Sequence, residues 1–156
     1  MTTIAGLPAV GSVAPDFTLL SDHRKPVTLS SFRGKQNVVL AFFPFAFTST
    51  CTAELCDFGN DVPQFSAADT IVFGISCDSF HTLKAFKAHE KMTVDLLSDI
   101  KREVSRAYGV LIEDLFVSSR AYVIIDKQGI VRWTHNEAEL GHKRSNAELL
   151  AHLQAL

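Results

Sequence analysis

An unbroken apolar segment, followed by a short loop and a helical pattern, is the feature that most constrains how this chain can fold. Residues 37–43 are apolar after the first position, which predicts a central strand covered on both faces. Residues 51–67 follow with helical spacing, and Gly59 and Pro63 are expected to bend that helix. Residues 44–51 therefore lie where a buried strand turns into a helix.

The rest of the chain alternates between strand and helix patterns. The predicted strands cover residues 17–20, 27–29, 37–43, 70–76, 94–97, 121–125 and 130–133. The predicted helices cover residues 51–67, 79–91, 103–108 and 145–156. Ser79 is an expected N-cap, and residues 126–129 form a hairpin turn signal. This order predicts a three-layer α/β sandwich in a single domain over residues 1–156, although periodicity alone leaves several α/β topologies open.

Length, charge and hydropathy exclude several classes of protein. A chain of 156 residues suits one domain with a substantial core. It lacks the roughly 18-residue apolar run that a membrane span requires, so no membrane association is predicted. The net charge of −2, with mixed signs, does not indicate a nucleic-acid partner. Residues 1–12 hold neither a basic cluster nor an apolar signal core, and the three cysteines do not suggest a secreted disulfide framework, so a cytoplasmic location is expected.

Cys51 stands at the predicted start of a helix. Backbone N–H groups at that point lack intrahelical partners, and the helix dipole favours negative charge. A thiol placed there is expected to lose its proton more readily than a free cysteine, and the thiolate is the nucleophilic form. The hydroxyl of Thr48, three residues earlier, is expected to donate to that sulfur or to a substrate oxygen. These residues predict a reactive cysteine.

The spacing Pro44-x-x-x-Thr48-x-x-Cys51 resembles the active-site loop of the peroxiredoxins, which are thiol peroxidases. Residues 119–126, Ser-Arg-Ala-Tyr-Val-Ile-Ile-Asp, resemble the strand that carries the active-site arginine of that family, which corresponds to Arg120. Further matches follow the family's order at residues 14–17, 74–79, 97–99 and 107–110. The resemblance therefore covers most of the chain.

This resemblance implies a thioredoxin-like fold with a central mixed sheet, and a peroxidase that reduces hydrogen peroxide or organic hydroperoxides without metal, haem or flavin. Cys51 is implied as the peroxidatic cysteine. Donors from Arg120 and Thr48 would stabilise charge on the leaving oxygen, while Pro44 stiffens the loop and shields the sulfur. Glu54 matches an acidic position of the alkyl hydroperoxide reductase E group, where it would orient Arg120 by an ion pair. Alternatively, it is a first-turn carboxylate that favours the helix dipole.

Cys56 follows Cys51 by five residues, a spacing that resembles the peroxiredoxin Q group. That resemblance implies that a sulfenic acid on Cys51 is resolved by an intramolecular disulfide with Cys56. In a regular helix their Cα atoms would lie ~8.7 Å apart, whereas a disulfide needs less than ~7 Å, so pairing requires the first turns to unwind. The loop itself is most similar to the one-cysteine alkyl hydroperoxide reductase E group. A core role for Cys56, resolution by Cys77 and resolution by an external thiol therefore stay open.

Reducing equivalents are expected from an external thiol, namely thioredoxin, glutaredoxin or a low-molecular-weight thiol. Phe45 and Phe47 lie in the loop beside Cys51 and are expected to line the peroxide pocket or to form the contact of a homodimer. The six histidines are scattered and no Cys-x-x-Cys occurs, so no metal site is predicted. Two rival interpretations are a redox sensor or relay on the same fold, and a thioredoxin-fold chaperone or scaffold without redox chemistry.

Overall fold

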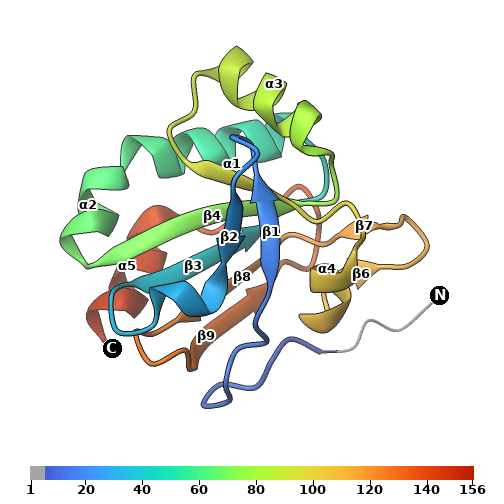
Figure 1. Ribbon diagram of the computed structural model, residues 1–156. Coiled ribbons are helices and arrows are strands. Elements are labelled where there is room, and N and C mark those ends of the chain that lie inside the picture. Colours follow the sequence, from blue (N-terminus) through green and yellow to red (C-terminus); the bar gives the residue numbers. More distant parts are fainter. Residues whose placement is uncertain (1–5) are drawn as a thin grey trace.

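The computed structural model describes residues 6–156, so residues 1–5 of the predicted domain lie outside the described residues. Within residues 6–156, a mixed seven-stranded sheet has the strand order β2-β1-β5-β4-β3-β8-β9 (Figure 1). Its strands are β1 (Thr18–Ser21), β2 (Pro26–Thr28), β3 (Asn37–Phe42), β4 (Thr70–Ser76), β5 (Asp95–Ser98), β8 (Ala121–Ile125) and β9 (Val131–Asn136).

Helices cover both faces of this sheet (Figure 1). One face carries α1 (Ser49–Asn60), α2 (Val62–Ala67), α3 (Phe80–Glu90) and α5 (Asn146–Gln154). The other face carries the 3₁₀ helix η1 (Leu29–Phe32) and α4 (Glu103–Ala107). The predicted three-layer α/β sandwich with a central mixed sheet is confirmed.

Strand β3 lies in the interior of the sheet and is buried on both faces, as its sequence predicts. Val39 and Ala41 face the layer of α1, whereas Val38, Leu40 and Phe42 face the layer of α4. All five are at most 1% exposed. Because successive side chains of a strand point to opposite faces, a strand covered on both sides must be apolar at every position.

Two neighbours of β3 fix the position of the loop that follows it. On one side β8 runs antiparallel, with Ala41 opposite Tyr122, so the residue before β8 lies beside the end of β3. On the other side β4 runs parallel, with Ala41 next to Gly74. A Cβ added to Gly74 would lie 2.8 Å from Cδ2 of Leu55 in α1. The absence of a side chain at Gly74 therefore lets α1 pack closely on the sheet, directly behind the loop.

The predicted helix over residues 51–67 is divided rather than bent. α1 ends at Asn60, and α2 begins at Val62 with Pro63 in its first turn. Proline has no N–H to donate, and it is tolerated at a helix start where that donor has no intrahelical partner. Gly59 stays within α1.

A short hairpin of β6 (Leu111–Ile112) and β7 (Val117–Ser118) is present that the sequence pattern did not predict. The other predicted elements are found with shifts of a few residues at their ends. The largest is in β9, which begins at Val131 and runs to Asn136. Among residues 6–156, no helix combines the length and the apolar character that crossing a membrane requires.

Candidate active site

Cys51 lies in the first turn of α1, at the point where β3 has passed through the loop into the helix. Thr48 is the N-cap residue and has extended backbone, with φ −89° and ψ 154°. The Cys51 side chain is fully buried against the apolar layer between α1 and the sheet. Cys51 therefore belongs to the turn of α1 whose N–H groups lack intrahelical partners, and its side chain is shielded from water.

Arg120 donates directly to the Cys51 sulfur. Its Nη2 lies 2.9 Å from Sγ, although the two residues are separated by 69 positions in the sequence. Its Nε donates to the backbone oxygen of Leu140 at 3.0 Å, and its Nη1 donates to Oε1 of Glu54 at 3.0 Å. Arg120 is only 1% exposed, so its positive charge acts on the sulfur with little screening by solvent.

The ion pair expected between Glu54 and Arg120 is formed in the structure. Burial acts to lower the pKa of Arg120, but Glu54 and Cys51 outweigh it and leave that pKa above its ordinary value. Burial raises the pKa of the Glu54 carboxyl, while the charge of Arg120 and a hydrogen bond from Tyr122 oppose the rise. Glu54 is thus a buried carboxyl whose charged form depends on a small number of partners.

Tyr122 is a member of this network that the sequence analysis did not identify. Its hydroxyl donates to Oε2 of Glu54, and its oxygen accepts a hydrogen bond from the backbone N–H of Arg144 at 3.0 Å. A signal for it was present, because Tyr122 lies two positions after Arg120 in the segment that resembles the arginine-carrying strand of the family, and residues at that spacing on a strand share a face. The backbone oxygen of Leu140 carried no such signal, since any residue offers a carbonyl.

Thr48 and Pro44 lie in the loop as expected, but the Thr48 hydroxyl is directed elsewhere. It donates to the backbone oxygen of Phe45 at 2.9 Å, which closes a turn within the loop, so the expected donation to the Cys51 sulfur is corrected. Donation to a substrate oxygen stays a prediction. Pro44 is buried, directly after the end of β3.

The loop is also fastened to the neighbouring strand by a carboxylate that the sequence analysis missed. Oδ2 of Asp78 accepts the backbone N–H of Ala46 at 2.9 Å and the hydroxyl of Ser76 at 2.8 Å. The Oγ of Ser98 donates to the backbone oxygen of Asp78 at 2.7 Å. These contacts tie residues at the ends of β4 and β5 to the loop that precedes Cys51.

Phe45 and Phe47 are exposed on the surface of the loop, at 43% and 50% respectively. The Phe47 ring packs on Phe86 of α3, with 4.9 Å between ring centroids, and its edge meets His89 at 5.9 Å. Phe47 has a φ of 67°, in the left-handed region that residues other than glycine seldom adopt. The loop thus presents apolar surface to solvent close to Cys51.

All three cysteines are free thiols and occupy different surroundings. Cys56 is half-buried on α1 and packs against the same apolar layer as Cys51. Burial raises the pKa of the Cys56 thiol, and the charges of Glu90 and Asp57 add to the rise. Both Cys51 and Cys56 belong to the continuous helix α1, so they are not paired here.

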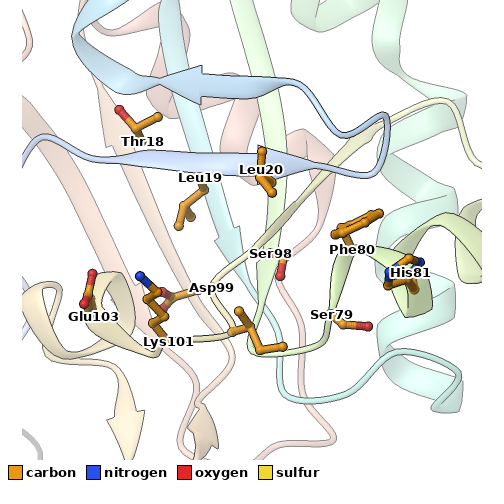
Figure 2. A pocket seen from close by; sticks show the side chains of 11 residues that line it. Thr18, Leu19, Leu20, Ser79, Phe80, His81, Ser98, Asp99, Lys101 and Glu103 are labelled. Carbon is orange, nitrogen blue, oxygen red and sulfur yellow. The ribbon is translucent and has the colours of Figure 1, made fainter.

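A cleft of about 490 Å³ lies between β1, the start of α3 and the segment from the end of β5 to the start of α4 (Figure 2). Its lining consists of Thr18, Leu19, Leu20, Ser79, Phe80, His81, Ser98, Asp99, Ile100, Lys101 and Glu103. Neither Cys51 nor Arg120 belongs to its lining. The cleft is therefore separate from the site around Cys51.

Among residues 6–156, one group of metal-binding side chain types lies close together, formed by Asp22, His23 and Asp95. The Lys87 ammonium is 3.3 Å from Oδ2 of Asp22 and 3.0 Å from Oδ1 of Asp95. Lys87 thus forms salt bridges with both carboxylates, so the group is explained as a salt-bridge cluster.

Residues 10–134 match the model of the AhpC/TSA family. Alkyl hydroperoxide reductase E of Mycobacterium tuberculosis is 37% identical over 150 residues, which cover 94% of this chain and 98% of that protein. The chloroplastic peroxiredoxin Q of Sedum lineare is 38% identical over 148 residues, covering 94% of this chain and 78% of that protein. The crystal structure of the reduced 2-Cys peroxiredoxin of Plasmodium vivax matches with a TM-score of 0.87 and 34% identity, covering 95% of this chain and 82% of that chain.

Proposed function

Since this chain belongs to the AhpC/TSA family of peroxiredoxins and is a thiol-dependent peroxidase, we propose that Cys51 is its peroxidatic cysteine and that Arg120 activates it. The observation that carries the proposal is the 2.9 Å contact between Nη2 of Arg120 and Sγ of Cys51 in a buried site. A cation that donates to sulfur favours the thiolate, which is the nucleophile. We propose hydrogen peroxide and organic hydroperoxides as the substrates.

In the first step the Cys51 thiolate attacks one oxygen of the hydroperoxide. A sulfur–oxygen bond forms and the O–O bond breaks, so sulfur is oxidised to a sulfenic acid and the departing oxygen leaves as an anion. That anion takes a proton and becomes water or an alcohol. The Arg120 guanidinium and the N–H groups at the start of α1 are proposed to stabilise the developing charge, supported by the contact of Arg120 with the sulfur. Thr48 is proposed to donate to the substrate oxygen after leaving Phe45.

Glu54 and Pro44 act on this step indirectly. Oε1 of Glu54 holds Nη1 of Arg120 at 3.0 Å, which leaves Nη2 free to face the sulfur. A guanidinium has a planar fork of donors, so fixing one nitrogen also orients the other. Pro44 is buried and limits the conformations of the loop, because its ring fixes φ. These two residues are proposed as supports of Arg120 and of the loop.

We further propose that Cys56 resolves the oxidised sulfur. Its thiol attacks the Cys51 sulfur, an S–S bond forms, the S–O bond breaks, and the hydroxyl leaves as water with the thiol proton. Two thiols of an external reductant then reduce the disulfide. Because burial keeps the Cys56 thiol protonated within α1, unwinding of the first turns would both bring the sulfurs together and release that restraint.

Mass spectrometry after one equivalent of hydrogen peroxide tests this resolution. The wild type and Cys77→Ser are expected to yield a Cys51–Cys56 linkage, whereas Cys56→Ser is expected to retain sulfenic acid on Cys51. Persistent sulfenic acid in the wild type, without the linkage, would refute resolution by Cys56. It would instead favour the alternative one-cysteine mechanism, in which an external thiol forms a mixed disulfide with Cys51. The continuity of α1 through both cysteines is the observation that supports this alternative.

The reductant is proposed to be thioredoxin, glutaredoxin or a low-molecular-weight thiol. Each would be supplied separately to peroxide-treated enzyme, and steady peroxide consumption would identify the one that sustains turnover. Consumption that stops after one equivalent with all three would support the sensor or relay instead.

A cytoplasmic location is also proposed, supported by three free thiols. Cell fractionation would contradict it if the chain were recovered outside the cytoplasmic fraction.

A homodimer through the active-site loop is proposed because Phe45 and Phe47 expose apolar rings beside Cys51. Light scattering over a dilution series is expected to show a dimer that Phe45→Ser and Phe47→Ser weaken. Val10→Ser offers a matched control, since Val10 is 62% exposed and lies outside this loop. A monomer at every concentration would remove the dimer proposal.

A further inference from the structure

Tyr122 occupies a position from which it controls the orientation of the Arg120 guanidinium. The two residues lie on the same face of one chain segment, and Tyr122 is fully buried. Its hydroxyl bonds Oε2 of Glu54, while Oε1 of the same carboxyl bonds Arg120. A continuous series of contacts therefore runs from the Tyr122 hydroxyl through Glu54 and Arg120 to the Cys51 sulfur.

We propose that Tyr122 is a positioning residue of the peroxidase reaction: its hydroxyl holds Glu54 in the charged form and aims it at Arg120, so that Nη2 of Arg120 faces the sulfur. This inference rests on the proposed function of Cys51 and assigns Tyr122 no direct contact with the peroxide.

Hydrogen-bond accounting fixes the direction of the contact between Tyr122 and Glu54. A phenol has one hydrogen to donate. The Tyr122 oxygen accepts from the backbone N–H of Arg144, which cannot accept in return, so the phenol hydrogen is free to point at Glu54. Burial and the nearby Glu54 charge raise the pKa of Tyr122 above its ordinary value, so the hydroxyl keeps its proton at neutral pH. Tyr122 is thus a permanent donor to the carboxylate.

The charge state of Glu54 depends on the groups packed around it. Burial raises its pKa, and the opposing groups are Arg120, the Tyr122 hydroxyl and, more weakly, Lys143. Lys143 is also paired with Asp57 of α1, at 2.6 Å between Nζ and Oδ2. The side chain of Arg144 is directed to a different carboxylate, with its Nε 2.6 Å from Oε1 of Glu137.

The Cys51 sulfur belongs to the same network through Arg120 and, when ionised, competes with Glu54 for that cation. Removing the Tyr122 hydroxyl takes away one of the few contacts that favour a charged Glu54. The pKa of Glu54 must then rise further.

The sign of the expected effect follows from the form of Glu54 that is active. Only the carboxylate pairs with Arg120, so the peroxide reaction weakens as the pH falls through the pKa of Glu54. A higher pKa in Tyr122→Phe therefore moves the acid side of the pH–rate profile to higher pH. A shift of one pKa unit corresponds to an about tenfold lower rate at mildly acidic pH, with a smaller loss at alkaline pH.

Tyr108→Phe is the matched control. Tyr108 is also fully buried and also loses one hydrogen bond on this change, from its hydroxyl to the backbone oxygen of Pro15 at 2.6 Å. It lies in the layer on the opposite face of the sheet from Cys51. Both variants are expected to lose stability, but only Tyr122→Phe is expected to change the pH dependence.

The experiment measures the rate of Cys51 oxidation by hydrogen peroxide from mildly acidic to mildly alkaline pH, using quenched samples and mass spectrometry. Fluorescence of Trp133 is avoided because its ring stacks on His152 at 4.3 Å and would respond to histidine protonation. An acid limb displaced to higher pH in Tyr122→Phe alone supports the inference. Superimposed profiles of Tyr122→Phe and Tyr108→Phe would overturn it while leaving Cys51 as the peroxidatic cysteine. A wild type that reacts no faster than a free thiol would overturn both.

A second variant keeps the inference testable if Tyr122→Phe folds poorly. Glu54→Gln replaces the carboxylate by a neutral group of the same shape, and it is expected to react more slowly than the wild type, with a pH–rate profile that differs from the wild-type profile on the acid side. A Glu54→Gln profile that superimposes on that of the wild type would show that the acid side does not depend on Glu54, and the role assigned to Tyr122 would fall with it.

Discussion

Cys51 and Cys77 are both buried, yet the charged groups around them are opposite in sign. Cys77 directly follows β4, and Cys51 follows the loop after β3, the strand parallel to β4. Cys51 receives a hydrogen bond from the Arg120 guanidinium at 2.9 Å. Cys77 has the hydroxyl of Ser105 at 3.7 Å, and that hydroxyl donates to the carboxylate of Asp99 at 2.7 Å. Burial raises the pKa of the Cys77 thiol, and the Asp99 charge adds to the rise.

Under the proposal that Cys51 is the peroxidatic cysteine, burial by itself does not make a cysteine reactive. Removing water disfavours a thiolate wherever it occurs, so an apolar site with an anion nearby keeps the thiol protonated. A cation next to a sulfur acts in the opposite direction, because it favours the thiolate. In this fold the two sites differ in the Arg120 side chain, which contacts Cys51 and not Cys77.

The largest expected difference comes from replacing each sulfur by oxygen. Cys51→Ser is expected to lower the rate of peroxide reduction by more than about a thousandfold, because it removes the nucleophile. Cys77→Ser is expected to leave the rate unchanged, since the proposed reaction uses Cys51 and Cys56 and not Cys77. Peroxide consumption under identical conditions measures both. A large loss in Cys77→Ser would break the comparison.

A smaller effect is expected from Arg120. Arg120→Met removes the charged donor and is expected to lower the rate of Cys51 oxidation about 10²- to 10³-fold. Arg120→Lys keeps the charge but loses the planar fork whose separate nitrogens bond Cys51, Glu54 and Leu140, so an intermediate rate is expected. Either change removes the hydrogen bond from the guanidinium to the buried Glu54 carboxyl, so circular dichroism serves as a control for folding. Equal rates for wild type and a folded Arg120→Met would contradict the role of the guanidinium.

The smallest effect on rate is expected in the surroundings of Cys77. Asp99 is buried and accepts from the backbone N–H groups of Val104 and Ser105 and from the Ser105 hydroxyl. Asp99→Asn is therefore expected to lower the free energy of unfolding by ~1–3 kcal/mol, measured by denaturant titration. The rate of Cys51 oxidation should not change. A stability equal to that of the wild type would show that these hydrogen bonds matter less than their geometry suggests.

Much of the fold was predictable because its elements carry strong local patterns. The apolar run at residues 37–43 and the strand at residues 121–125 are buried on both faces, so every position had to be apolar. The peroxiredoxin resemblance supplied the thioredoxin-like topology, which solved peroxiredoxin structures confirm. The β6–β7 hairpin was missed because strands of two residues are too short to show a period.

The site was predictable to the extent that residue type and position on a strand or helix determine it. Cys51, Glu54 and Arg120 meet because the first two are one helical turn apart and the third directly precedes β8, beside the end of β3. The direction of the Thr48 hydroxyl depends on a turn within the loop, which no periodicity encodes. Contacts through backbone groups, such as the one to Leu140, are equally invisible in a sequence, because every residue carries the same atoms.

The central claim is that the guanidinium of Arg120 makes one buried sulfur far more reactive than an ordinary thiol. The most direct measurement is the second-order rate of hydrogen peroxide reduction by Cys56→Ser/Cys77→Ser, which retains Cys51 as its only thiol, with and without Arg120→Met. The account predicts rapid sulfenic acid formation on Cys51, lost when Arg120 is removed. A rate as slow as that of a free thiol, or one unaffected by Arg120→Met, would contradict it.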